Sequence, residues 1–188
     1  NMSMNRATSL SIIIPTYNEA DIIHETIREV EKHIPEHVAC EIIIADDGMD
    51  HMAESLKVYR KARPNTSVVH MKNQKRAGKG LSIAKAIAIS KGNYVGFIDA
   101  DMSVHPSNID LALSKLSDSH VVIAQRVGNR FFHDESIVVT LIGHGFHFLN
   151  KVLFPRHLKN VHDTQCGFKF FRSDVAKQLY EDVVATDG

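Results

Sequence analysis

The sequence contains little cysteine and proline, no tryptophan and no long apolar run, and each absence excludes a class of protein. Two cysteines, Cys40 and Cys166, are too few for a disulfide framework and too sparse for a zinc site, and a reducing, cytoplasmic compartment suits them best. No stretch of about 18 apolar residues exists, so we expect no membrane-spanning helix. Five prolines and ten glycines among 188 residues, of which 44% are hydrophobic, exclude a disordered chain and predict one globular domain.

Neither sign of charge is in excess. Twenty-two Lys and Arg residues balance 22 Asp and Glu residues, which argues against a nucleic-acid partner and against bulk attraction to an anionic membrane. Twelve histidines are scattered without a Cys/His cluster, and such histidines more often pack or face water than bind a metal. We therefore assign none of them to a site.

Apolar runs and amphipathic patterns alternate up to residue 124. Runs typical of buried strands occur at residues 10–14, 41–45, 67–71, 94–98 and 120–124. Helical patterns lie between them at residues 23–34, 52–62 and 79–91, and Pro106 opens another helix. Asn18 is the predicted N-cap of the first helix. The alternation predicts an α/β fold of the doubly wound, Rossmann-like kind, with a mostly parallel sheet flanked by helices.

The pattern changes after Arg126. Residues 136–154 carry an amphipathic helical pattern, residues 161–171 are short and irregular, and residues 173–183 are helical again. We expect this later part to be an acceptor side that is appended to a nucleotide-binding unit.

The stretch with the most chemical content is Asp99-Ala100-Asp101, directly after the fourth apolar run. Two carboxylates this close raise each other's pKa, and a divalent cation removes that cost. Oxygen ligands favour Mg²⁺ or Mn²⁺, and ligands bind beyond the carboxyl ends of the strands in such sheets. The alternative is a solvated turn that caps the helix opened by Pro106.

Two other strand ends carry polar residues that suit a nucleotide. In residues 15–19 (Pro-Thr-Tyr-Asn-Glu), Tyr17 can stack on a base and Glu19 can accept a hydrogen bond from a base or ribose. In residues 46–48 (Asp-Asp-Gly), the carboxylates can accept from a base N–H or from ribose hydroxyls. Both stretches are also compatible with capped turns between a strand and a helix.

Basic residues follow the remaining strand ends. Residues 76–80 (Arg-Ala-Gly-Lys-Gly) precede a helix and suit a phosphate, although their spacing is not that of a Walker A loop. Arg126 ends the fifth run, where its planar guanidinium can reach a diphosphate. Residues 162–169 (His-Asp-Thr-Gln-Cys-Gly-Phe-Lys) concentrate polar groups in an otherwise apolar tail, and a plain loop is the alternative.

Taken together, these motifs resemble the GT-A glycosyltransferases of family 2 over residues 10 to 130. Residues 163–169 resemble the dolichyl- and polyprenyl-phosphate hexose synthases, nearest the glucose branch. The resemblance implies one GT-A catalytic domain over residues 1–188. Residues 9–130 would form its nucleotide-sugar half and residues 131–188 its acceptor-side half, trimmed at the C-terminus.

The resemblance also implies roles for individual residues. The nucleotide pocket would hold Pro15, Tyr17, Glu19, Asp46, Asp47, Lys79 and Asp99. Asp99 and Asp101 would hold the metal, Mg²⁺ or Mn²⁺, and the catalytic residues would be Asp101, Arg126 and Asp163. Gln165 and Lys169 would contact the acceptor. Two departures from the family pattern are Met49-Asp50 after the Asp-Asp-Gly stretch and Ser103, where a Gln often assists the metal.

The implied reaction is inverting transfer of a hexose from UDP-glucose or GDP-mannose to a polyprenyl or dolichyl phosphate. The enzyme would then act at the cytoplasmic face of a membrane, with peripheral association through the acceptor or through segments beyond residue 188. Two alternatives stay open: a family 2 transferase that acts on a glycan, and a nucleotide-sugar-binding domain with little activity. A nucleotidyltransferase is disfavoured, because such enzymes carry a Gly-rich basic loop where this chain has residues 15–19.

Overall fold

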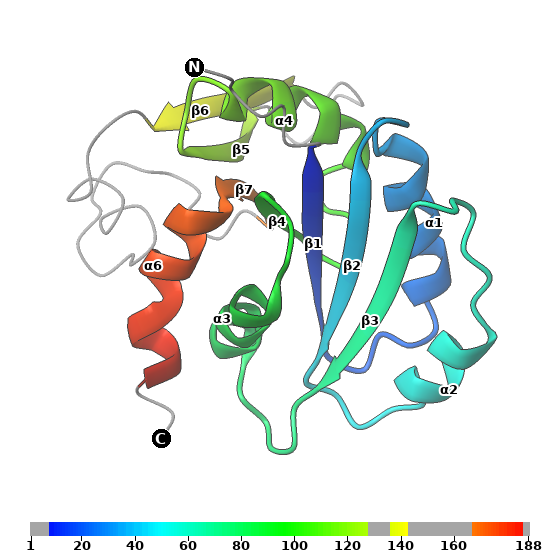
Figure 1. Cartoon of the computed structure of the whole chain (residues 1–188). Helices are drawn as coiled ribbons and strands as arrows, with labels where there is room; N and C mark the ends of the chain where they lie inside the picture. Colours follow the sequence, from blue (N-terminus) through cyan, green and yellow to red (C-terminus); the bar gives the residue numbers. More distant parts are fainter. Residues whose placement is uncertain (1–7, 128–135, 143–166, 186–188) are drawn as a thin grey trace.

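The computed structural model describes residues 8–127, 136–142 and 167–185, which build one seven-stranded sheet with helices on both faces (Figure 1). The strand order is β3-β2-β1-β4-β7-β5-β6. The elements are β1 (Ser9–Thr16), α1 (Ile23–His33), β2 (Ala39–Asp46), α2 (Met52–Val58), β3 (Thr66–Lys72), α3 (Lys79–Ile89), β4 (Tyr94–Ile98), η1 (Pro106–Asn108), α4 (Ile109–Leu116), β5 (Val121–Val127), β6 (Ser136–Ile142), β7 (Phe168–Arg172) and α6 (Ser173–Ala185).

The strands β1 to β4 run parallel, as the alternating sequence pattern predicts. Pro15 pairs with Ala45 and Thr16 with Asp46, so β1 and β2 end side by side. On the other side of β1, Ile13 pairs with Phe97, close to the end of β4. This register brings the carboxyl ends of β1, β2 and β4 to one edge of the sheet, where a doubly wound fold binds its ligands.

The other half of the sheet is antiparallel, which the sequence did not reveal. β7 lies between β4 and β5 and runs antiparallel to both, and β6 pairs antiparallel with β5. The helix predicted over residues 136–154 is therefore wrong for residues 136–142, and residues 143–154 lie outside the described ranges. The irregular segment predicted over residues 161–171 is likewise wrong at its end, where β7 begins. The β-branched residues of β6 (Ser-Ile-Val-Val-Thr-Leu-Ile) suit a strand, and pairing with β5 decides the outcome.

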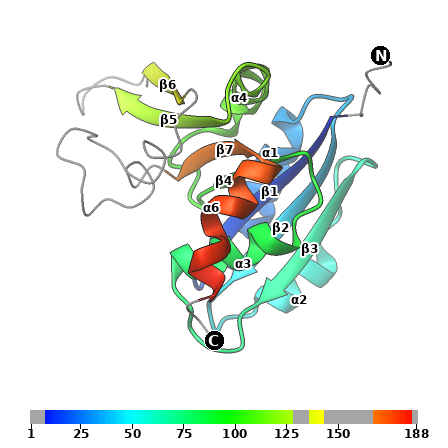
Figure 2. The same ribbon diagram turned by 60° about the vertical axis from the view of Figure 1, so that its left-hand side comes forward.

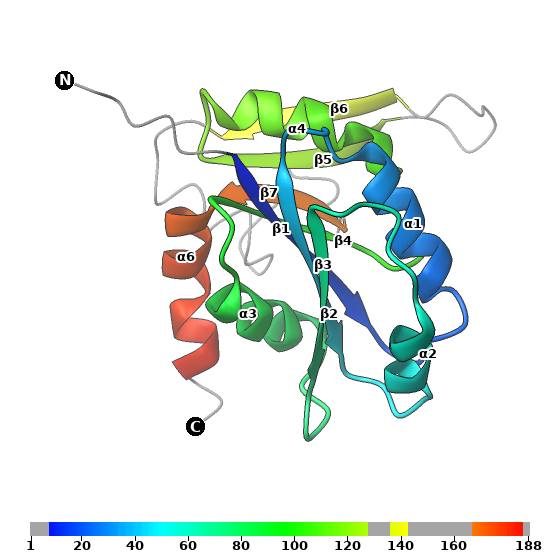
Figure 3. The same cartoon turned by 45° about the vertical axis from the view of Figure 1, so that its right-hand side comes forward.

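The core lies on both faces of the sheet, because successive strand residues point to opposite sides. Ile12 and Ile14 of β1 pack with α1, α2 and α4, whereas Ile13 packs with α3 and α6 (Figures 1 and 3). Figure 2 shows α3 and α6 side by side on their face of the sheet. No helix within the described ranges is long and apolar enough to cross a membrane.

A buried carboxylate shortens the second helix. The structure ends α2 at Val58, whereas the pattern predicted a helix to residue 62. Glu31 of α1 is fully buried, and its Oε2 accepts hydrogen bonds from the Tyr59 hydroxyl at 2.9 Å and the Ala62 N–H at 2.8 Å. These bonds hold the chain after Val58 against α1 instead of in a further helical turn.

Asn18 and Cys40 have structural places in this half of the sheet. Asn18 does not cap α1, because the helix has Ile22 at its N-cap, and the Asn18 Oδ1 instead accepts from the Met49 N–H at 2.7 Å. Cys40 is buried in β2, and burial raises the pKa of its thiol to about 12. The Cys40 thiol is thus protonated at neutral pH and unsuited to nucleophilic chemistry.

Replacing Gly96 by Ala should destabilise the protein. A Cβ at Gly96 of β4 would lie 2.5 Å from the ring of Phe170, which is fully buried in the neighbouring strand β7. We expect the free energy of unfolding, measured by chemical denaturation, to fall by about 1–3 kcal/mol. Gly80→Ala is the matched control, because its Cβ would meet no atom within 4 Å and α3 should gain up to about 1 kcal/mol. Equal effects of the two substitutions would contradict this packing.

Candidate active site

A cleft of roughly 390 Å³ opens at the edge where β1, β2 and β4 end. Its lining comes from four separate stretches of the chain: Pro15, Thr16, Tyr17 and Glu19 after β1, Ala45 and Asp47 at β2, Arg76, Gly78, Lys79 and Ser82 around the start of α3, and Asp99, Ala100 and Asp101 after β4. Among the predicted nucleotide and metal residues, the structure thus brings together Pro15, Tyr17, Glu19, Asp47, Lys79, Asp99 and Asp101.

The acid pair lies at the end of β4. The Asp99 side chain is 21% exposed, and its Oδ1 lies 2.5 Å from the Lys79 Nζ, so a cation already pairs with this carboxylate. Asp101 is exposed, and its Oδ1 accepts from the Ser103 N–H at 3.0 Å. The left-handed φ of 51° at Met102 makes the tight turn that follows the pair.

Glu19 adds a third carboxylate to this group. Its Oε2 accepts from the Tyr17 N–H at 3.1 Å. Burial raises the pKa of Glu19, the bond from Tyr17 opposes the rise, and the negative charges of Asp101 and Asp99 add to it. Three acidic groups that repel one another in one cleft fit a divalent cation, since carboxylate oxygens are the ligands that Mg²⁺ and Mn²⁺ prefer.

Asp47 organises the loop that carries the basic residues. Its Oδ1 accepts from the Ala77 N–H at 2.7 Å and from the Asn73 amide at 3.0 Å, and its Oδ2 accepts from the Gly78 N–H at 2.8 Å. Burial acts to raise the pKa of Asp47, but these donors outweigh it and hold the pKa below its ordinary value. Asp47 is therefore an ionised anchor for the loop before α3.

The anchored loop presents two cations to the cleft. Gly78 is the N-cap of α3 with φ of 81°, a conformation that glycine adopts without strain. Lys79 is the first residue of the helix and reaches Asp99. The Arg76 guanidinium lies 4.6 Å from the centre of the Tyr17 ring, a cation–π contact that joins this loop to the end of β1.

Asp46 is a predicted nucleotide residue that does not line the cleft. It is buried, and its Oδ2 contacts the His70 Nε2 at 2.9 Å and the Lys72 Nζ at 3.1 Å. Its Oδ1 accepts from the Gly48 N–H at 2.9 Å. Asp46 thus joins β2 to β3, while its neighbour Asp47 faces the cleft.

The four remaining predicted residues lie in the later part of the chain. Arg126 is in β5 opposite Ile137 of β6, and the structure describes its strand but not its side chain. Lys169 is buried in β7, with its Nζ 5.6 Å from the centre of the Phe97 ring. Asp163 and Gln165 lie outside the described residues, so their predicted roles stay predictions.

Sequence reasoning missed the part that Gly167 plays. The Gly167 carbonyl accepts from the Asp99 N–H at 3.0 Å, and a Cβ at this glycine would overlap the Asp99 carboxylate. The residue stands in a stretch that the sequence had singled out, at 163–169. Its contact with the acid pair depends on the pairing of β7 with β4, which no local pattern showed.

Comparison with known proteins places this geometry in a family. Residues 11–180 match the family model described as Glycosyl transferase family 2. The dolichyl-phosphate beta-glucosyltransferase of Dictyostelium discoideum is 28% identical to this chain in an alignment 191 residues long. The alignment covers 91% of this chain and 56% of that protein. The chain spans about half the length of the curated relatives it matches.

Two solved structures share the fold. A mannosyltransferase from Pyrobaculum calidifontis, in complex with GDP-Man and Mn²⁺, has a TM-score of 0.60 at 16% identity and matches 90% of this chain and 46% of that chain. TarS of S. aureus, in complex with UDP-GlcNAc, has a TM-score of 0.62 at 17% identity and matches 92% of this chain and 47% of that chain. Both likenesses concern the GT-A fold alone. The family match, which runs through the cleft and both halves of the sheet, shows that this chain belongs to glycosyltransferase family 2.

Proposed function

We propose that this chain transfers a hexose from a nucleoside-diphosphate sugar to a polyprenyl or dolichyl phosphate, with inversion and with a divalent metal. The main support for the proposal is the cleft, where the carboxylates of Glu19, Asp99 and Asp101 lie with Lys79 and with the loop that carries Arg76. Carboxylates for a metal and cations for phosphates are what a diphosphate leaving group needs.

The cleft residues divide the binding of the donor among them. Tyr17, 47% exposed, offers a ring face to a base, and the polar groups after β1 and β2 suit ribose. Lys79 and Arg76 neutralise diphosphate oxygens, aided by the N–H groups at the start of α3. Asp47 holds this loop in place, so that its cations meet the donor without reorganisation.

Asp99 and Asp101 would hold Mg²⁺ or Mn²⁺, and such an ion would neutralise the charge that develops on the departing nucleoside diphosphate. The Lys79 ammonium, which pairs with Asp99, would then be released toward a phosphate oxygen. Ser103 contributes its N–H to Asp101, so it acts on the acid pair by orienting Asp101.

The acceptor follows from its own chemistry and from the names of the relatives. A phosphate monoester is already anionic at neutral pH, so it attacks the sugar carbon with little need of a general base. The enzyme's part is then to position two anions in line, and Arg126 at the end of β5 is our candidate for the acceptor phosphate. Curated relatives are dolichyl-phosphate beta-glucosyltransferases, which favours a glucose donor and action at a membrane surface.

Asp101→Asn should abolish the metal-dependent part of nucleotide binding. A ligand that binds the folded state raises the melting temperature by mass action, so we expect UDP-glucose or GDP-mannose to raise it further with Mn²⁺ than without. The measurement is a thermal-shift panel of UDP, GDP, UDP-glucose and GDP-mannose with and without Mn²⁺. Asp118→Asn, an exposed acid in the turn after α4, is the control and should keep the full shift. A wild-type melting temperature that no nucleotide changes would remove the main support for the transferase proposal.

Gly167→Ala should weaken metal-dependent nucleotide binding without touching a ligand. The added Cβ displaces the Asp99 carboxylate, so we expect the Mn²⁺-dependent thermal shift to fall to a minor fraction of the wild-type value. Gly92→Ala is the matched control, because its Cβ would instead crowd the Ser11 backbone. It should lower the melting temperature of the free protein and keep the metal-dependent shift. The same ligand response in the two variants would show that Gly167 does not position Asp99.

Glu19→Gln should stabilise the metal-free protein at neutral pH and weaken its metal binding. An acid whose pKa is raised by folding costs stability while it is ionised, and the cost disappears as the pH falls below its ordinary value of 4.5. We expect a higher melting temperature than wild type at pH 7, with the difference vanishing toward pH 4. Glu36→Gln, at an exposed site after α1, should leave the melting temperature unchanged. A lower melting temperature for Glu19→Gln at pH 7 would contradict the electrostatics of the cleft.

A further inference from the structure

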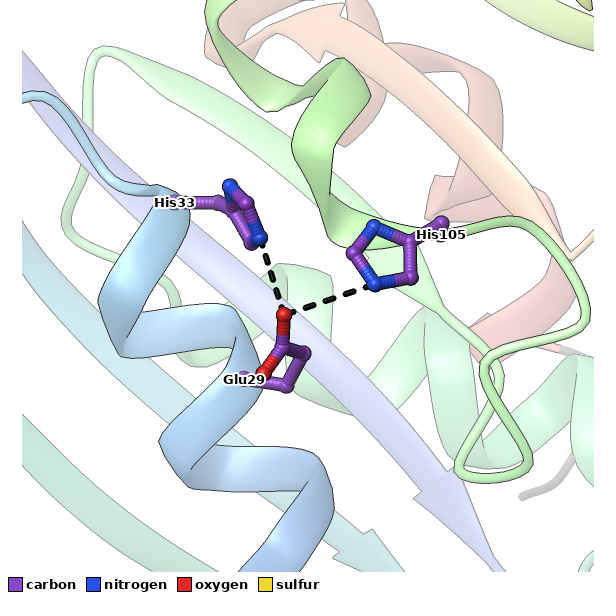
Figure 4. A group of neighbouring side chains, drawn as sticks. All are labelled: Glu29, His33 and His105. Carbon is purple, nitrogen blue, oxygen red and sulfur yellow. Dashed lines mark hydrogen bonds and ion pairs between the residues drawn. The ribbon is translucent and has the colours of Figure 1, made fainter.

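Glu29, His33 and His105 form a group of side chains that could hold a metal ion, and none of them lines the cleft (Figure 4). Glu29 and His33 are one turn apart on α1, and His105 approaches them from the segment that precedes η1. The Glu29 Oε1 lies 2.9 Å from the His33 Nε2 and 3.4 Å from the His105 Nε2. One ligand atom from each residue lies within 4.8 Å of the other two.

Two of the three distances between ligand atoms are close to those of a zinc coordination shell. Tetrahedral Zn²⁺ with bonds of about 2.0–2.2 Å to nitrogen and oxygen holds its ligand atoms about 3.3 Å apart. The distances from the Glu29 Oε1 to the two histidine nitrogens, 2.9 and 3.4 Å, lie on either side of that value. Two imidazoles and one carboxylate, with a fourth position open to water, form a known zinc donor set.

We propose that Glu29, His33 and His105 bind Zn²⁺, in a site separate from the acid pair of the cleft. Imidazole nitrogen favours Zn²⁺, whereas Mg²⁺ and Mn²⁺ favour the all-oxygen ligands of Asp99 and Asp101. The two sites therefore select different ions by the chemistry of their donors.

The local charges are compatible with the ion. A glutamate carboxylate is ionised at neutral pH, so Glu29 can act as a ligand. Lys32 also contacts the Glu29 Oε1, at 3.4 Å, and its side chain is 68% exposed, so it can turn into solvent when Zn²⁺ enters. The Glu29 and His33 side chains are each 25% exposed and that of His105 is 54% exposed, which gives the ion a path to the site.

Binding changes one hydrogen bond of His105. In the metal-free protein its Nδ1 accepts from the Ser107 N–H at 3.2 Å, a long contact at an exposed position. A ring that binds Zn²⁺ through Nε2 carries its remaining proton on Nδ1, so this contact is exchanged for the metal bond.

The site joins α1 to the segment that follows the acid pair. One link already exists, because the Thr26 hydroxyl of α1 donates to the Ala100 carbonyl at 2.7 Å, between Asp99 and Asp101. A zinc bond to His105 adds a second link four residues beyond Asp101. The Thr26 hydrogen bond and the ion together therefore hold the two ends of residues 100–105, which include Asp101, against one helix.

The experiment is a Zn²⁺ titration by isothermal calorimetry of the whole chain and of His33→Ala/His105→Ala. The chain has further histidines, so the quantity that matters is the difference between the two proteins. We expect the double variant to lose one equivalent of bound Zn²⁺, and Glu29→Gln to weaken that equivalent by at least about tenfold. Co²⁺ in place of Zn²⁺ should give the visible absorption of a tetrahedral site in wild type and lose it in the double variant.

Three comparisons distinguish this site from unspecific binding and from binding in the cleft. His37→Ala, at an exposed site after α1, should bind as many equivalents of Zn²⁺ as wild type. If this variant loses an equivalent, the binding is unspecific and the proposal is overturned. Asp101→Asn should also keep the equivalent, so this result does not depend on the transferase proposal. Loss in Asp101→Asn would assign the ion to the cleft instead. Equal Zn²⁺ stoichiometry in wild type and the double variant, with both proteins folded by circular dichroism, would refute the site.

Discussion

Repulsion among like charges at one edge of the sheet is the constraint on which the site depends. The strands β1, β2 and β4 end together, so Glu19, Asp47, Asp99 and Asp101 enter one cleft, where the charges of Asp101 and Asp99 act against the ionised form of Glu19. Three of these carboxylates are compensated differently: Asp47 by backbone N–H groups, Asp99 by Lys79, and Glu19 by the Tyr17 N–H and the charge of Lys79, which do not offset burial and leave the pKa of Glu19 raised. The cleft thus holds carboxylates whose charge a metal ion would balance and cations whose charge a diphosphate would balance.

The sequence predicted the features that follow from the order of the parallel strands, namely which strands are buried and which strand ends meet. Runs such as residues 10–14 are apolar on both faces, as a strand covered by helices on both sides must be. In a parallel sheet the residues after each strand converge, so the stretches at 15–19, 76–79 and 99–101 could be grouped without any knowledge of side-chain positions. The resemblance to family 2 rests on these same stretches and agrees with the family match.

What the sequence could not show depends on contacts between distant segments. Asp46 and Asp47 are adjacent and chemically identical, yet only Asp47 lines the cleft, because Asp46 ends β2 and bonds His70 and Lys72 of β3, whereas Asp47 follows the strand and bonds the loop before α3. Residues 136–142 have apolar positions at helical spacing, and pairing with β5 overrides that pattern. His105 looked like one scattered histidine among twelve until the fold placed it against α1, 72 positions from His33 in the chain.

The position of β7 has a consequence for how the chain folds. β4 and β5 are separated in the sheet by a strand that is synthesised after both, so each keeps one unpaired edge until residue 172 has been made. Unpaired edges invite association with other chains, and late closure by distant residues slows folding. The sheet therefore cannot close before residue 172 has been made, and during that interval the nascent chain is more open to association than a fold whose strands pair in the order of synthesis.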